Sequence, residues 1–197
     1  MGVEQTTSFF IVERQLIKNV FMKVVYYVAT SLDGCIADVN ESVAWLEKLH
    51  INQEASDYDS FFSTVDALLM GRKTYDFVYN YGSWPYGNKP TWVCTRREVP
   101  QMDGCNLQNE REPITAIQKA KNLGMKKTWV VGGGNLVSTL LKAELLTHLS
   151  ISVMPIILGD GIKLVDSLPS HLYLWQENST SISGFTQIEY RIKKLES

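Results

Sequence analysis

Two glycine-containing segments of this chain each lie where an apolar strand pattern changes into a helix pattern. Gly71-Arg72-Lys73-Thr74 follows the run Ala67–Met70, and Gly132-Gly133-Gly134-Asn135 follows the run Thr128–Val131. Free N–H groups at the start of a helix attract anions, and glycine lets an anion approach the backbone closely. Strand-to-helix transitions of this kind are typical of α/β folds, and together the two segments predict a ligand with two phosphate regions.

Strand and helix patterns alternate along the chain to about residue 145, after which strand patterns dominate. This order predicts an α/β fold with a central, mostly parallel sheet, flanking helices and a C-terminal antiparallel pair of strands. The expected strands are 23–29, 67–70, 91–94, 128–131, 148–153, 171–177 and 185–192, and the expected helices are 42–49, 57–65, 72–79, 114–123 and 135–142.

The regular pattern begins at Met22, so we expect a single domain at 22–197 preceded by an N-terminal extension at 1–21. The apolar run Phe9–Val12 leaves two alternatives open for the extension: disorder, or docking on the domain or on a partner. The extension has no apolar signal-peptide core, and no stretch of the chain approaches the roughly 20 apolar residues that span a bilayer. We therefore expect a cytoplasmic protein.

The net charge and the spacing of the cysteines and histidines indicate which kinds of ligand the chain binds. The chain carries 19 Lys and Arg against 21 Asp and Glu, for a formal net charge of −2, which argues against a nucleic-acid-binding surface. The cysteines Cys35, Cys94 and Cys105 and the three histidines are widely spaced, without the ligand spacing of a metal site. We therefore expect a small-molecule partner and no metal.

Basic residues lie beside the first glycine segment and after the strand 91–94. Arg72 and Lys73 fall in the first turn of a helix, where cations are unfavourable unless a negative group such as a phosphate compensates them. Thr95-Arg96 offers a hydroxyl and a guanidinium group, which suit a phosphate monoester such as an adenosine 2′-phosphate. Solvated helix and loop charges are the alternative for both sites. The second glycine segment lacks the G-x-G-x-x-G pattern, which excludes a classical Rossmann fold.

Four segments in this order resemble the dihydrofolate reductase-like fold. They are Ser31–Ala37, Leu69–Tyr75, Val130–Asn135 and Met154–Gly161, and the resemblance covers roughly residues 22–192. The last segment carries the pattern Pro-x-x-Leu-Gly-x-Gly, which is typical of the riboflavin-biosynthesis reductase branch rather than of true dihydrofolate reductases. The chain thus resembles a stand-alone member of that branch, which includes the C-terminal domain of bacterial bifunctional deaminase-reductases.

The resemblance implies that NADPH binds across the strand ends. The residues implied on the adenosine side and on one side of the pyrophosphate are Gly71, Arg72, Lys73, Thr74, Thr95 and Arg96. Those implied on the other side of the pyrophosphate are Val131, Gly132, Gly133, Gly134, Asn135 and Leu136, with a cis peptide bond between Gly132 and Gly133. Those implied beside the nicotinamide are Ala29, Ile36 and Ala37, and Asp33 in the adjoining loop is the candidate catalytic residue.

One departure from true dihydrofolate reductases bears on the substrate. Those enzymes carry an acidic residue three positions before a tryptophan of the helix that follows the first loop, whereas Ser42 holds that position before Trp45 here. The adjacent Glu41 is not equivalent, because a shift of one residue turns a helical side chain by about 100°. We therefore do not expect efficient reduction of dihydrofolate.

The sequence leads to the hypothesis of an NADPH-dependent reductase that transfers hydride to a C=O or C=N carbon of a small heterocyclic or ribosylamino-pyrimidine-like substrate. A dihydrofolate reductase and a non-catalytic NADPH-binding module remain the alternatives. The zinc signature of a deaminase partner domain, H-x-E with P-C-x-x-C, is absent from the sequence. Related proteins commonly form dimers, so we expect a homodimer, with the apolar region 149–157 as the candidate contact.

Overall fold

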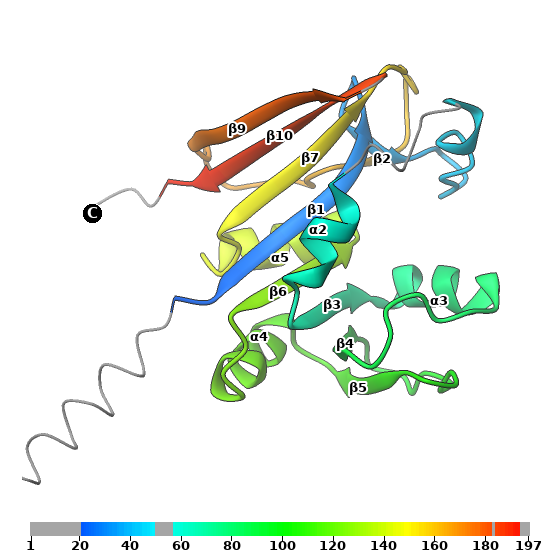
Figure 1. Ribbon diagram of the computed structural model, residues 1–197, viewed down its shortest axis with the longest axis vertical. Coiled ribbons are helices and arrows are strands. Elements are labelled where there is room, and N and C mark those ends of the chain that lie inside the picture. The colour runs from blue at the N-terminus through cyan, green and yellow to red at the C-terminus, as the bar shows by residue number, and fades with distance from the viewer. Residues whose placement is uncertain (1–20, 50–56, 183, 194–197) are drawn as a thin grey trace, which may run out of the picture.

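The computed structural model describes residues 21–49, 57–182 and 184–193 of the chain (Figure 1). The strands in these ranges are β1 (Lys23–Ser31), β2 (Cys35–Ala37), β3 (Ala67–Gly71), β4 (Pro90–Cys94), β5 (Asn106–Glu110), β6 (Lys127–Gly132), β7 (His148–Met154), β8 (Ile162–Lys163), β9 (Leu174–Ile182) and β10 (Phe185–Ile192). The helices are the 3-10 helix η1 (Glu47–Leu49) and the α-helices α2 (Tyr58–Ser63), α3 (Arg72–Tyr81), α4 (Pro113–Asn122) and α5 (Gly134–Lys142).

The main sheet has the strand order β5-β4-β3-β6-β1-β7-β10-β9 within the described residues. The strands from β5 to β7 in this order run parallel, and β10 runs antiparallel to both β7 and β9. The short strands β2 and β8 pair with each other. The predicted α/β fold with a mostly parallel central sheet and a C-terminal antiparallel pair is confirmed. Because the parallel strands share one direction, their carboxyl ends lie at one edge of the sheet, where ligands of open α/β sheets bind.

Both faces of the parallel part of the sheet are covered by helices. On β3, Ala67 and Leu69 belong to the core cluster formed with α4 and α5, whereas Leu68 and Met70 belong to the cluster formed with α3. Helix α2 adds partly buried aromatic residues to the second cluster, and Figure 1 shows α2 and α5 on opposite faces of β1. Successive side chains of a strand point to opposite faces, so a strand covered on both sides reads as a nearly continuous apolar run.

The predicted helix 42–49 is wrong, because turns occupy this region and only η1 forms at its end. The carboxylate of Asp38 accepts hydrogen bonds from the backbone N–H groups of Asn40 and Ser42, at 2.8 and 3.0 Å. Such local bonds compete with the hydrogen bonds of a helix. Trp45 is nevertheless buried, beside Met154 and Phe185. The apolar positions of the segment therefore enter the core although the helix does not form.

Strands β2, β5 and β8 have no clear sequence signal. Strand β5 reads Asn-Leu-Gln-Asn-Glu and lies at the edge of the sheet, half-exposed, so it lacks an apolar run. Strand β8 has two residues, both exposed. Strand β9 begins later than predicted and extends further, because its polar residues pair with β10 along most of that strand. Polar edge strands are what periodicity detects least well.

The candidate dimer contact through residues 149–157 is wrong for β7. This strand lies between β1 and β10, so both of its hydrogen-bonding edges are occupied, and most of its side chains are buried. In the part of the chain that the structure describes, no helix is long and apolar enough to cross a membrane. No group of three or more His, Cys, Asp or Glu side chains in these described ranges is arranged to hold a metal ion.

Candidate functional site

The two glycine segments meet at the carboxyl edge of the sheet, where β3 and β6 are neighbours. Met70 pairs with Gly132, and a Cβ atom added to Gly71 would lie 3.7 Å from the carbonyl oxygen of Gly132. Gly71 and Gly133 are the N-cap residues of α3 and α5, and as glycines they have no side chain that could accept a capping hydrogen bond. Two helix starts, each with backbone N–H groups that no N-cap side chain satisfies, thus lie side by side. This arrangement suits a ligand with adjacent phosphate groups.

The second glycine segment is shaped by close backbone packing. The peptide bond between Gly132 and Gly133 is cis, as the resemblance implied. A Cβ atom added to Gly134 would lie 2.6 Å from the carbonyl oxygen of Lys163 in β8, so only glycine fits at this position. By contrast, Gly71 has ordinary extended backbone angles and room for a Cβ atom. The fold therefore requires glycine at 134 but not at 71.

The cations at the start of α3 already have protein partners. The Arg72 Nε donates to both carboxylate oxygens of Asp76, at 2.7 and 2.9 Å, and one terminal nitrogen donates to the carbonyl oxygen of Glu98 at 3.0 Å. The Lys73 ammonium forms an exposed ion pair with Glu41. The carboxylates of Asp76 and Glu41 thus already supply negative groups that compensate these charges. The same contacts hold the Arg72 guanidinium beside the loop that follows β4.

Thr95 and Arg96 begin the loop that also carries Glu98, and they follow Cys94, which is opposite Gly71 because β4 pairs with β3. The backbone N–H of Thr95 donates to the carbonyl oxygen of Glu110, which fixes the start of the loop, and Arg96 is exposed. Along the edge, the strand ends of β4, β3, β6 and β1 thus present a basic loop, two glycine segments and Ala29 in that order. The predicted adenosine, pyrophosphate and nicotinamide contacts follow one another in the same order.

The remaining predicted contacts surround the second helix start and the end of β1. Thr74 faces the glycine segment, since its Oγ1 would lie 3.3 Å from a Cβ atom on Gly132. Val131 is half-buried, Asn135 is exposed and Leu136 is buried in the core. Ile36 and Ala37 belong to β2, and a Cβ atom added to Gly161 would lie 2.2 Å from the carbonyl oxygen of Ala37. The segment 155–161 therefore packs directly on the strand predicted to border the nicotinamide.

Asp33 ties the loop after β1 to the segment 155–161. Its carboxylate accepts hydrogen bonds from the Ser31 hydroxyl at 2.6 Å and from the backbone N–H groups of Leu158 and Gly159, at 3.1 and 2.8 Å. Hydrogen bonds from Ser31 and Leu158 are the main causes that lower the pKa of Asp33 to about 2. An ionised carboxylate cannot donate a proton near neutral pH. The geometry favours a positioning role, and a catalytic role for Asp33 stays a prediction.

The substitution Asp33→Asn should change how stability depends on pH. A carboxyl group with a folded pKa near 2 and an unfolded pKa of about 3.9 stabilises the fold above about pH 4, and this contribution is lost as the pH falls towards 2. The melting temperature of the wild-type chain should therefore fall more steeply over this interval than that of Asp33→Asn. The exposed variant Asp103→Asn should follow the wild type, and equal slopes for Asp33→Asn and wild type would refute the assignment.

Two further contacts of the site were not predicted from the sequence. The Lys163 ammonium donates to the buried Sγ of Cys35 at 3.1 Å, across a sequence separation of 128 residues. This hydrogen bond raises the pKa of Lys163. Asp76 orients Arg72 from the next turn of α3. An i,i+4 acid after a base can be found by inspecting the helix, but the Cys35 contact depends on how β2 and β8 pair.

The family model described as "RibD C-terminal domain" matches residues 22–186, which include every predicted site residue. The chain belongs to the RibD C-terminal domain family. The predicted resemblance to the riboflavin-biosynthesis reductase branch is thereby confirmed, and the family indicates a reductase-like protein.

Similar proteins span nearly the same length. The uncharacterized protein YwjB of Bacillus subtilis is 29% identical over 170 residues, covering 85% of this chain and 97% of that protein. A crystal structure from Shewanella sp. PV-4, provisionally named a riboflavin biosynthesis protein, has a TM-score of 0.77 and 31% identity, covering 88% of this chain and all of that one. Dihydrofolate reductase from Enterococcus faecalis has a TM-score of 0.57 at 16% identity, over 87% of this chain and 97% of that one. The last likeness confirms the dihydrofolate reductase-like fold of this RibD-family chain.

Proposed function

We propose that this RibD-family chain is an NADPH-dependent reductase that transfers hydride to a C=O or C=N carbon of a small heterocyclic or ribosylamino-pyrimidine-like substrate. The observation that carries the proposal is the adjacency of the helix starts at Gly71 and Gly133, which fits a pyrophosphate. Bound NADPH supplies the hydride from its nicotinamide ring, and the protein supplies binding and orientation. Family membership supports the reductase class.

The residues of the edge fit the parts of NADPH in sequence. Gly71, Thr74 and the segment 132–136 would hold the pyrophosphate, with Val131 and Lys73 beside them. Arg72, Thr95 and Arg96 would bind the adenosine 2′-phosphate, since arginine forks match phosphate oxygens. Ala29, Ile36 and Ala37 would border the nicotinamide with apolar side chains. A homodimer and a cytoplasmic location stay predictions.

The site disfavours dihydrofolate as the substrate. Ser42 lies in a turn, where its N–H donates to Asp38 and its hydroxyl accepts from the N–H of Ala44 at 3.1 Å. Glu41 is turned to the surface, where it pairs with Lys73. Neither residue therefore presents a carboxyl group that could assist protonation of a pterin. The proton that accompanies hydride transfer would come from water.

A stopped-flow experiment tests the proposed function. The full chain is loaded with NADPH and mixed with a ribosylamino-pyrimidine, dihydrofolate or a simple carbonyl compound, while the absorbance of the reduced nicotinamide is followed. We expect oxidation with the ribosylamino-pyrimidine and a rate about a hundredfold lower with dihydrofolate, because a missing general acid costs about that factor. Binding of NADPH without oxidation by any compound would identify a non-catalytic module instead. Faster reaction with dihydrofolate would favour a dihydrofolate reductase.

A further inference from the structure

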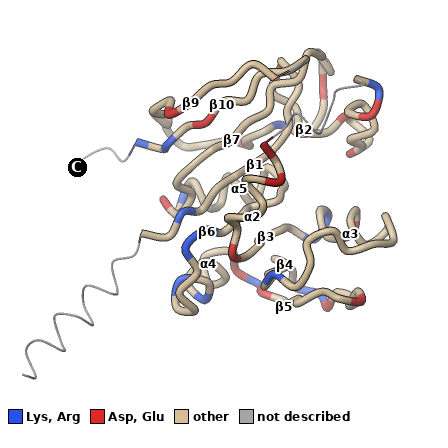
Figure 2. The backbone as a smooth tube through the Cα atoms, in the orientation of Figure 1, with Lys and Arg blue, Asp and Glu red and all other residues tan. Residues whose placement is uncertain are grey.

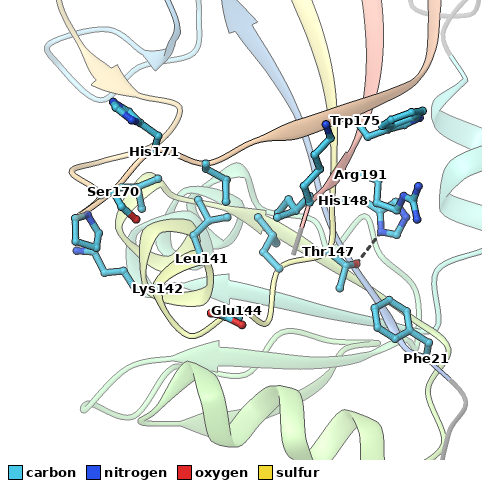
Figure 3. A pocket seen from close by; sticks show the side chains of 16 residues that line it. Phe21, Leu141, Lys142, Glu144, Thr147, His148, Ser170, His171, Trp175 and Arg191 are labelled. Atoms are coloured by element: carbon cyan, nitrogen blue, oxygen red, sulfur yellow. Dashed lines mark hydrogen bonds between the residues drawn. The ribbon is translucent and has the colours of Figure 1, made fainter. Parts of the chain in front are cut away.

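A pocket lies at the opposite end of the sheet from the glycine segments (Figure 3). It has a volume of about 800 Å³ and is enclosed by the end of α5, the start of β7, the end of β10 and the segment 168–175. His148 begins β7 and pairs with Arg191 near the end of β10. These residues are at the amino ends of the parallel strands, whereas Gly71 and Gly132 are at the carboxyl ends. The pocket is thus separate from the proposed cofactor site.

The lining of this pocket is positively charged. Among its described lining residues, Lys142, Arg191 and Lys193 contribute three cations, and Glu144 contributes the one carboxylate. Figure 2 shows basic positions where β1 begins and where β10 ends. Glu177, which is outside the lining, lies 3.2 Å from the Arg191 Nε. One carboxylate in the wall and one behind it do not balance the basic groups, so an anion would be attracted to this end of the sheet.

The same positive charges affect the pKa of the half-buried His148 imidazole. Burial is the largest cause that lowers its pKa, and the charges of Lys23, Arg191 and Lys127 lower it further, against the opposing effect of Glu177. The His148 Nε2 lies 3.8 Å from Glu177 and its Nδ1 lies 2.7 Å from the Thr147 hydroxyl. An anion placed nearby would offset these charges and favour the protonated imidazole.

The pocket also offers an aromatic surface. The Trp175 side chain is 55% exposed, and the Lys193 ammonium lies 5.2 Å from the centroid of its ring. Figure 3 shows Trp175, Arg191 and His148 along one side, with Leu141 across from them. A flat ring can cover an exposed indole and the neighbouring apolar wall while an acidic group reaches the cations at the rim.

We propose that this pocket binds a small aromatic molecule that carries an anionic group. The ring would pack on Trp175 and Leu141, and the anionic group would lie between Lys193 and Arg191 near His148. The volume of about 800 Å³ falls within the range of small-molecule sites. The site does not depend on the proposed reductase activity, because it shares no residue with the glycine edge.

The test compares two probes of nearly the same shape on the full chain: 8-anilinonaphthalene-1-sulfonate, an anion, and N-phenyl-1-naphthylamine, which is neutral. We expect the sulfonate to bind about tenfold more tightly, since the charged contacts are available only to it. Lys193→Gln should weaken the sulfonate roughly fivefold and leave the neutral probe unchanged, whereas Trp175→Ala should weaken both. The sulfonate should also raise the pKa of His148 in an NMR titration.

The control variants are Lys121→Ala, which removes an exposed charge from α4, and Arg72→Ala at the glycine edge. Neither should alter binding of the sulfonate. Equal affinity for the two probes would show an apolar surface for a protein segment and overturn the proposal. Loss of binding in Arg72→Ala but not in Lys193→Gln would place the probe at the other site and overturn it as well. If Trp175→Ala has a lower oligomeric mass in solution than the wild type, a second copy of the chain covers the pocket, and this result would also overturn the proposal.

Discussion

Replacing Arg72 and Arg96 together by alanine is expected to lower the affinity for NADPH about a hundredfold, while the affinity for NADH falls by less than about threefold. Each charge-assisted hydrogen bond to a phosphate contributes roughly 1.5 to 3 kcal/mol, and two such contacts would be lost. The Arg72 guanidinium is held by Asp76 and by the carbonyl oxygen of Glu98, directly beside the loop that carries Arg96. In the proposed function these two cations bind the 2′-phosphate, the group that distinguishes NADPH from NADH. Calorimetric titration of both nucleotides measures the difference.

A matched control removes two charges elsewhere. Lys121 lies near the end of α4 and Lys126 follows the helix, and both are exposed and away from the carboxyl edge. The double variant Lys121→Ala/Lys126→Ala should leave the ratio of the two affinities unchanged. If the Arg72/Arg96 variant loses affinity for NADPH and NADH equally, the assignment of the 2′-phosphate to this loop is wrong.

Gly71→Ala is expected to weaken NADPH at least about tenfold with little change in melting temperature. The backbone at Gly71 has φ −78° and ψ 165°, which any residue adopts, and the added Cβ atom would have no neighbour closer than 3.7 Å. Exchange of glycine for alanine at an N-cap costs no more than about 1 kcal/mol. The methyl group would, however, fill the space between the two helix starts that a pyrophosphate needs. This variant should therefore lose affinity for NADPH while it keeps the stability of the wild type.

Gly82→Ala provides the opposite pattern at the other end of the same helix. Gly82 ends α3 with φ 85°, a left-handed conformation in which alanine is strained by about 1 kcal/mol. This variant should melt at a lower temperature and bind NADPH like the wild type. Unchanged NADPH affinity in Gly71→Ala would mean that no ligand approaches the backbone there.

The central strands could be predicted from the sequence, because burial on both faces leaves few polar positions. The helices could be predicted because each follows a strand and repeats apolar residues with a helical period. Strands β1, β3 and β6 and helices α3 and α5 lie where their patterns predict them, with ends that differ by a few residues. The region 42–49 could not be predicted correctly, because its apolar spacing fits a helix while Asp38 stabilises turns. Trp45 is buried in the core although the helix does not form.

The candidate site was predictable only in parts. Each glycine segment and the basic loop after β4 have local signals, but their adjacency depends on the strand order, which brings β4, β3 and β6 together. The close approaches of Gly134 to Lys163 and of Gly161 to Ala37 join segments distant in the sequence. The residue spacing within one segment does not predict such contacts. The pocket near Trp175 has no motif at all, since its lining comes from several elements.

Calorimetric titration of the full chain with NADPH tests whether the two glycine segments form one nucleotide-binding site. We expect saturation at one NADPH per chain and clearly weaker binding of NADH. Prior saturation with NADPH should also slow amide hydrogen exchange at the starts of α3 and α5. No saturable binding, or protection confined to other parts of the chain, would mean that the glycine segments do not form such a site.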